Sequence, residues 1–215
     1  MNFIAVKKFL IVGIVIINIL NLACMQGGPV QIHQRVACYS ESKNIFLMLM
    51  DTMMRNMDAV KTGISPDYDF ISQMIPHHQC AIEMAKYEIV NGRNFLIVQL
   101  AKSIVAEQAV EIQQMQFYQK HFLPADYLHK DKFKKEMIET MYWMMRNMPT
   151  DHKLDNVDTA FAMIMIPHHQ AGIDMAKVIL KFSSDKQTIG LSKLIIASQE
   201  VEIGQMSSFL IKRHE

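Results

Sequence analysis

The chain contains the same sequence pattern twice, and this duplication constrains its fold more than any other feature. Shifting the sequence by 91 residues aligns residues 50–115 with residues 141–206 without a gap, and 28 of those 66 positions are identical. A repeat of this kind is a structural unit that packs against its own copy. The sequence therefore predicts a first repeat at residues 44–122 and a second repeat at residues 131–213.

Each repeat is predicted to contain three helices. Gly and Pro are scarce, at 8 and 6 of 215 residues, which favours helices over turn-rich strands. The expected helices lie at about 42–61, 65–92 and 94–121 in the first repeat, and at about 131–148, 156–182 and 185–213 in the second. Ser65-Pro66 is typical of a helix start, because Ser caps the first turn and Pro fits the first helical position. Short connections between these helices predict an all-α bundle.

The first 23 residues are predicted to be an export signal. Lys7 and Lys8 precede an apolar run that ends at residue 23, the order found in secretory signal peptides. An uncleaved membrane anchor is the alternative, since a bilayer span needs roughly 20 apolar residues. Cys24 also suggests lipidation, although Asn21 stands where lipoprotein signals normally have Leu. We therefore expect a periplasmic or otherwise exported protein, with a flexible segment at residues 24–43 and membrane attachment through Cys24 or the N-terminal helix left open.

Charge and cysteine content limit the partners. The formal net charge is +1, which argues against nucleic acid, because binding to phosphates needs a dense basic face. Beyond Cys24 only Cys38 and Cys80 remain, and an exported pair could form a disulfide that the spacing does not decide. Cys80 aligns with Ala171, so a thiolate ligand common to both repeats is not expected.

Two adjacent histidine pairs recur in the middle helix of each repeat. Of 9 histidines, only His77-His78 and His168-His169 have counterparts in the other repeat. At 100° per residue, each pair and two nearby methionines fall within an arc of about 120° on one helix face. These methionines are Met74 and Met84 in the first repeat, and Met165 and Met175 in the second. A proline directly before each pair is expected to kink the helix there.

The flanking helices add further soft donors and one carboxylate per repeat. The first helices carry rows of methionine on one face: Met50, Met54 and Met57 in one repeat, and Met141, Met145 and Met148 in the other. The third helices place a Glu and a Met one turn apart: Glu111 with Met115, and Glu202 with Met206. The alternative is that the methionines fill the core and that each Glu pairs with an Arg or Lys.

These eighteen residues are the candidate metal ligands, and their chemistry favours copper. Thioether sulfur with imidazole nitrogen suits Cu(I), and imidazole also accommodates Cu(II). Zinc would want more thiolate or imidazole in a closed set, and calcium or magnesium would want oxygen donors. The sequence therefore predicts bound copper, with Cu(I) favoured and silver left open as another soft cation.

A known family shows the same motif. Asp-x-x-Phe-x-x-x-Met-x-x-His-His-x-x-x-x-x-Met-Ala occurs at residues 67–85 and again at residues 158–176. The pattern resembles the ferritin-like domain-of-unknown-function 305 family, over about 44–213. The resemblance implies a ferritin-like helical bundle, an exported location and the copper binding of its characterised member. It assigns the motif's Met and His positions to the two pairs and their methionines, with Gly172 replacing the usual small Ala found at Ala81.

The function predicted from these features is copper sequestration, tolerance or delivery by an exported, non-catalytic protein. One alternative is a metal-independent interaction bundle whose methionines form the core. Another is a ferritin-like oxidoreductase, which is disfavoured because di-iron sites need Glu-x-x-His and no Glu here precedes a His by three residues. The sequence leaves open the number of ions and whether the two repeats form separate sites or one.

Overall fold

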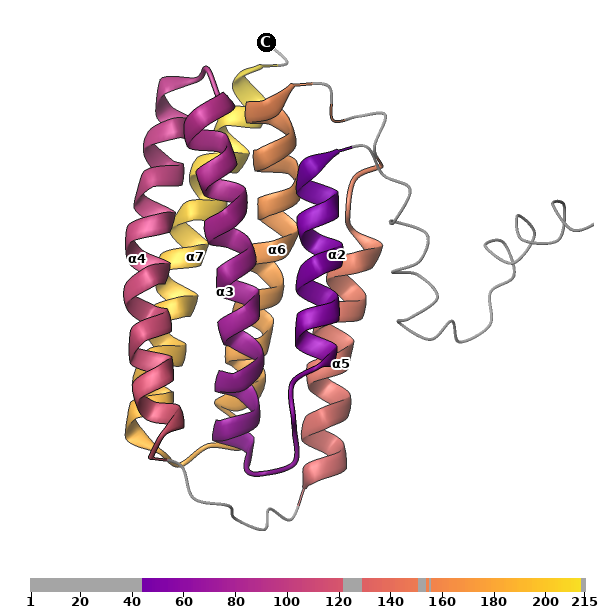
Figure 1. Cartoon of the computed structure of the whole chain (residues 1–215), viewed down its shortest axis with the longest axis vertical. Helices are drawn as coiled ribbons and strands as arrows, with labels where there is room; N and C mark the ends of the chain where they lie inside the picture. The colour runs from indigo at the N-terminus through magenta and orange to yellow at the C-terminus, as the bar shows by residue number, and fades with distance from the viewer. Residues whose placement is uncertain (1–43, 122–128, 151–153, 155, 214–215) are drawn as a thin grey trace, which may run out of the picture. The chain divides into compact units, whose positions relative to one another are not determined.

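The structure, a computed structural model, describes residues 44–121, 129–150, 154 and 156–213 (Figure 1). These ranges contain six α-helices and no strand, which confirms the all-α prediction. The helices are α2 (Ile45–Asp58), α3 (Pro66–Asn91), α4 (Phe95–Gln119), α5 (Lys130–Arg146), α6 (Val157–Ile179) and α7 (Lys186–Lys212). The predicted export signal at 1–23 and flexible segment at 24–43 lie outside the described residues. None of the described helices combines the length and hydropathy needed to cross a membrane.

The two repeats fold alike, as the duplication predicts. The helices α2, α3 and α4 form the first repeat, and α5, α6 and α7 form the second. Several helix starts are fixed by the expected caps: the Ser65 hydroxyl accepts a hydrogen bond from the Tyr68 N–H, and the side chains of Asn156 and Asp185 accept from Thr159 and Thr188. Such caps satisfy backbone N–H groups that have no partner inside the helix.

The helices α3 and α6 form the centre of the bundle. They contact each other, while α4 packs on α3, α7 packs on α6, and α4 also contacts α7 (Figure 1). The shorter helices α2 and α5 pack against α3 and α6. Two helices from different repeats thus meet along their middle, which is where both histidine pairs lie.

The prolines before the histidine pairs do not interrupt the helices. Pro76 lies inside α3, which is 26 residues long, and Pro167 lies inside α6, which is 23 residues long. Each proline removes one backbone donor and is buried. The residues on either side keep a helical register, so the angular positions expected from the sequence apply to the folded chain.

Hydrogen bonds connect a loop of each repeat to the start of a helix in the other repeat. The Asp158 carboxylate at the start of α6 accepts hydrogen bonds from the backbone N–H groups of Arg93 and Asn94, which join α3 to α4. The Ser183 hydroxyl, in the connection from α6 to α7, donates to the Asp67 carboxylate at the start of α3. These reciprocal bonds hold the helix ends of one repeat against the other, and they fix how α3 and α6 align.

Candidate metal centre

The helix α3 directs three nearby side chains toward three different helices. His77 faces α6, where its ring stacks on the ring of His168 with centroids 3.9 Å apart and an angle of 29° between the planes. His78 faces α4, and Cys80 faces α2. Residues one and three positions apart on a helix are rotated by about 100° and 300°, so this divergence follows from the helical register. The two histidines of this pair therefore lie in different environments, one against α6 and the other against α4.

Each repeat pairs its second histidine with a carboxylate. His78 Nε2 lies 2.8 Å from Glu111 Oε2, and His169 Nε2 lies 2.8 Å from Glu202 Oε2. The structure thus places both carboxylates beside imidazoles, where the sequence left an Arg or Lys partner open. A carboxylate in this position fixes the orientation of an imidazole and raises its basicity as a ligand.

The four histidines are inaccessible to solvent, and most of their ring nitrogens have no hydrogen-bond partner within the described part of the chain. All four side chains are 0% exposed. Neither ring nitrogen of His77, His168 or His169 has a hydrogen-bond partner among the described residues, and the same holds for Nδ1 of His78. The 2.8 Å approach of His169 Nε2 to Glu202 lacks the geometry of a hydrogen bond. A buried polar atom without a partner costs about 1–3 kcal/mol, so seven such nitrogens in one core demand an explanation.

Burial keeps the stacked histidines neutral. The pKa of His77 lies well below its ordinary value, first because of burial and then because of the nearby His78 and His169. The pKa of His168 is also lowered well below its ordinary value, by burial and by the other three histidines. Neutral imidazole is the form that binds metal, so these rings need not lose a proton when a cation arrives.

The predicted methionines are all buried, on two flanks of the central helices. Within the α3, α4, α6 and α7 helices, six are 0% exposed: Met74, Met84, Met115, Met165, Met175 and Met206. The rows expected on the first helices are also buried: Met50, Met54 and Met57 on α2, and Met141 and Met145 on α5. Met148 is buried too, but it lies beyond the end of α5, which stops at Arg146 and not at the expected residue 148. Met50 Sδ lies 3.8 Å from Cys80 Sγ, which points away from His78. The structure thus places a carboxylate beside one histidine of each repeat. Met50 of α2 instead lies on a different side of α3, next to Cys80.

Burial also explains the remaining cysteine and histidines. Cys80 is a free, buried thiol whose pKa is raised by burial and by the charge of Glu83. His121 and His129 are exposed, in keeping with their lack of a counterpart in the other repeat. Cys38, His33, His152 and His214 lie outside the described ranges.

Two buried glutamines belong to the same region, and the sequence-based site left them out. Gln108 and Gln199 are 2% and 1% exposed, and both amide atoms of each lack a hydrogen-bond partner within the described structure. They precede Glu111 and Glu202 by three residues, so they lie on the same helix faces as the carboxylates. The sequence did contain a signal for these glutamines, because Gln occupies the same position in both repeats. A polar side chain on a buried helix face needs a structural or functional reason.

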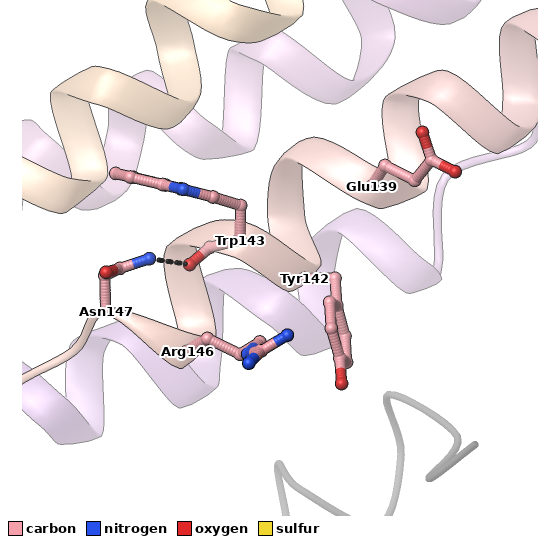
Figure 2. A pocket seen from close by; sticks show the side chains of 5 residues that line it. All are labelled: Glu139, Tyr142, Trp143, Arg146 and Asn147. Carbon is pink, nitrogen blue, oxygen red and sulfur yellow. Dashed lines mark hydrogen bonds between the residues drawn. The ribbon is translucent and has the colours of Figure 1, made fainter.

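The donor atoms in this core are of the types that soft cations prefer. Across the part of the chain that the structure describes, no three His, Cys, Asp or Glu side chains converge closely enough to hold a metal ion. Neutral imidazoles with unpaired nitrogens lie in a core that also holds thioethers, and this combination of donors suits Cu(I). A surface pocket on α5, lined by Glu139, Tyr142, Trp143, Arg146 and Asn147, contains none of these donors (Figure 2).

The fold defines a duplicated helical bundle with two buried histidine pairs at its centre, and the chain belongs to the family described as Domain of unknown function (DUF305). The family model matches twice, at residues 25–119 and 117–210. This confirms the resemblance drawn from the His-His motif. No curated protein sequence matches the chain.

Solved structures of one protein, CopM, are similar over about two thirds of this chain. CopM in the Cu(I)-bound form is 29% identical, with a TM-score of 0.53, over 69% of this chain and 98% of that chain. CopM in an Ag-bound form obtained by soaking is 28% identical, with a TM-score of 0.52, over 68% and 95%. A DUF305 fragment from Deinococcus radiodurans, at 20% identity and a TM-score of 0.50 over 68% and 96%, shares the fold.

Proposed function

We propose that this protein is an exported, non-catalytic copper-binding protein that holds the metal in the buried core between its repeats. The observation that carries the proposal is the stacked pair His77 and His168, whose four ring nitrogens are buried without partners. A protein that used this core for packing alone would be more stable with apolar side chains of similar size there. Retaining four imidazoles therefore points to a ligand.

Copper is supported by the donors and by the similar structures. His77, His78, His168 and His169 would supply nitrogen, and Met74, Met84, Met165 and Met175 would supply thioether sulfur from the same two helices. Soft donors of this kind favour Cu(I), with Cu(II) as the second state. CopM has been solved in Cu(I)-bound, Cu(II)-bound and Ag-bound forms.

The repeats would share one metal-binding region. His77 belongs to the first repeat and His168 to the second, yet their rings are in contact, so two distant independent sites do not fit this core. Each stacked histidine adjoins a carboxylate-paired one, since His77 precedes His78 and His168 precedes His169. The two pairs thus offer a continuous set of nitrogen donors across the repeat contact.

Export and the absence of catalysis are parts of the same proposal. The N-terminal pattern around Lys7 and Lys8 supports export, and fractionation of cells expressing the full chain tests it, with retention in the cytoplasm as the contrary result. Copper held by buried imidazole and thioether side chains suits storage or delivery. Sustained turnover of oxygen or peroxide by the metal-loaded protein would contradict the non-catalytic assignment.

The direct test is an anaerobic Cu(I) competition titration of the purified protein. Replacing His77, His78, His168 and His169 together by Ala should abolish high-affinity binding, whereas His121→Ala with His129→Ala, two exposed positions, should leave it unchanged. Because four core substitutions can unfold a bundle, His77→Gln with His168→Gln gives a second variant of nearly native volume, with circular dichroism as the check on folding. Unchanged affinity in a folded variant would defeat the proposal and favour a metal-independent interaction bundle.

A further inference from the structure

We propose that Gln199 is a positioning residue for His77: its side-chain amide, brought in from α7, holds the His77 imidazole in the orientation that a metal ion needs. The inference deepens the copper-binding function proposed above and rests on it. It concerns the histidines that have no carboxylate partner, and it assigns a role to a buried glutamine that the family motif does not include.

The four histidines fall into two kinds. His78 is hydrogen-bonded to Glu111, and His169 has the Glu202 carboxylate 2.8 Å from its Nε2. His77 has no such partner, and both of its ring nitrogens are unpaired. A metal-binding imidazole normally donates its second N–H to an acceptor, which sets the tautomer and the ring angle. An acceptor for His77 is therefore expected nearby.

Gln199 and His77 converge on one point above the backbone of Gly172. A Cβ atom placed on Gly172 would lie 2.5 Å from Gln199 Oε1 and 3.2 Å from His77 Cε1. Cε1 is the ring carbon between the two nitrogens, so the nitrogen-bearing edge of the imidazole and the amide oxygen both lie beside the position of that Cβ atom. The missing side chain of Gly172 is what leaves room for both groups.

The Gln199 amide is available for this interaction. It is 1% exposed, and neither its oxygen nor its nitrogen has a partner among the residues that the structure describes. Leaving both atoms unsatisfied is costly in a closed core, and a hydrogen bond from a His77 ring N–H to the amide oxygen would satisfy one atom of each group. The amide oxygen then accepts from one nitrogen of neutral His77, and the lone pair of the other nitrogen is left for the metal.

The two repeats differ at this point. Ala81 occupies the position in the first repeat that Gly172 occupies in the second, and it carries the Cβ atom that Gly172 lacks. The space above the backbone of Gly172 is therefore a feature of the second repeat. The histidine that lies beside it, His77, belongs to the first repeat. This gives a physical reason for the departure from Ala in the second copy of the motif.

The test is histidine-ring NMR on the metal-free full chain, combined with copper titration. Gln199→Leu removes the amide at similar volume, and Gly172→Ala puts a methyl group 2.5 Å from the present position of Gln199 Oε1, so that the amide has to move. Both should shift the ring ¹⁵N resonances of His77 toward a mixture of tautomers and weaken Cu(I) binding by about 10–100-fold. Gln205→Leu, an exposed change on the same helix, is the matched control and should do neither.

The two readouts separate this inference from the proposed function. Unchanged His77 ring resonances in folded Gln199→Leu protein would overturn the positioning role, whatever the copper affinity. Shifted resonances in a protein that binds no copper even as wild type would keep the contact and defeat the copper-binding function instead. Loss of stability without a change at His77 would assign Gln199 to packing, and this result also overturns the inference.

Discussion

The rings of His77 and His168 stack with their centroids 3.9 Å apart, although the two residues are 91 positions apart and belong to different repeats. The contact joins α3 to α6, the two helices at the centre of the bundle. The candidate metal centre therefore depends on both repeats, since neither repeat alone contains both rings.

The first prediction is that the two rings are energetically coupled in copper binding. His77→Ala and His168→Ala should each weaken Cu(I) binding, and the double variant should differ from the sum of the two by roughly 0.5–3 kcal/mol, as expected of residues in contact. Competition titrations of the four proteins give the coupling. The pair of exposed positions His121 and His129 should give none. Strict additivity at His77 and His168 would argue for two independent sites.

The second prediction concerns the carboxylates. Glu111→Gln or Glu202→Gln keeps the side-chain volume and removes the charge beside the imidazole, so copper affinity should fall about 10–100-fold. Glu83→Gln serves as the control, because Glu83 is an exposed partner of Lys86 on α3. Equal affinities for the Glu111 and Glu83 variants would leave the buried carboxylates without a role in the metal centre.

The third prediction is a loss of stability in acid in the metal-free protein. The pKa values of His77 and His168 are lowered from about 6.5 by burial, so the folded state resists protonation that the unfolded state accepts. The full folding stability is therefore present above about pH 6.5, where these rings are neutral in both states. It declines as the pH falls below about 6.5, because the unfolded state then binds more protons than the folded state. Urea denaturation at pH 7 and pH 5 should show this decline, and His77→Leu with His168→Leu should reduce it. A parallel decline in both proteins would place the acid sensitivity elsewhere.

Much of the fold was predictable because the duplication and the caps are local signals. Ser65, Asn156 and Asp185 mark helix starts through short-range hydrogen bonds, and the angular positions around His77 and His78 follow from the helical repeat. The His-His motif likewise identified the family. These features depend on residues close together in the chain, which a single sequence displays.

What the sequence could not supply were the contacts between helices. Nothing in the motif says that His77 meets His168 while His78 meets Glu111, because that depends on which helices become neighbours. The role of Gln199 was hidden for the same reason: its amide matters only once α7 lies over Gly172. The methionines were found as one class, since burial alone does not distinguish a ligand from a core side chain.

The fourth prediction separates thioether ligands from core methionines. Met74→Leu with Met165→Leu should cost less than about 1.5 kcal/mol of stability, because the volumes are similar, yet lower Cu(I) affinity at least tenfold. Met54→Leu with Met145→Leu, in the α2 and α5 rows, should have a smaller effect, because these helices contact α3 and α6 on a different flank from α4 and α7. An equal loss of affinity in both variants would extend the metal centre to the outer rows.

The fifth prediction concerns a buried carboxyl group away from the histidines. Glu88 on α3 is 0% exposed and adjoins Asp158, and its pKa is raised to about 8, first by burial and then by that neighbour. Burial alone would raise the pKa of Asp158, but hydrogen bonds from the N–H groups of Asn94 and Arg93, together with the nearby Glu88 carboxyl, lower it. The proton therefore resides on Glu88 at neutral pH, and one carboxyl of the pair stays charged.

The sign of the pH effect follows from the raised value. An unfolded Glu titrates near 4.5, so the stability gained from protonated Glu88 is fully present below that pH and is lost progressively as the pH rises to about 8. Within this window the slope approaches about 1.4 kcal/mol per pH unit. Glu88→Gln keeps a neutral donor beside Asp158 and should flatten the dependence, whereas Glu83→Gln, exposed on the same helix, should not. Denaturation midpoints at pH 5, 6.5 and 8 measure it, and identical slopes in wild type and Glu88→Gln would show that Glu88 is already ionised in the folded protein.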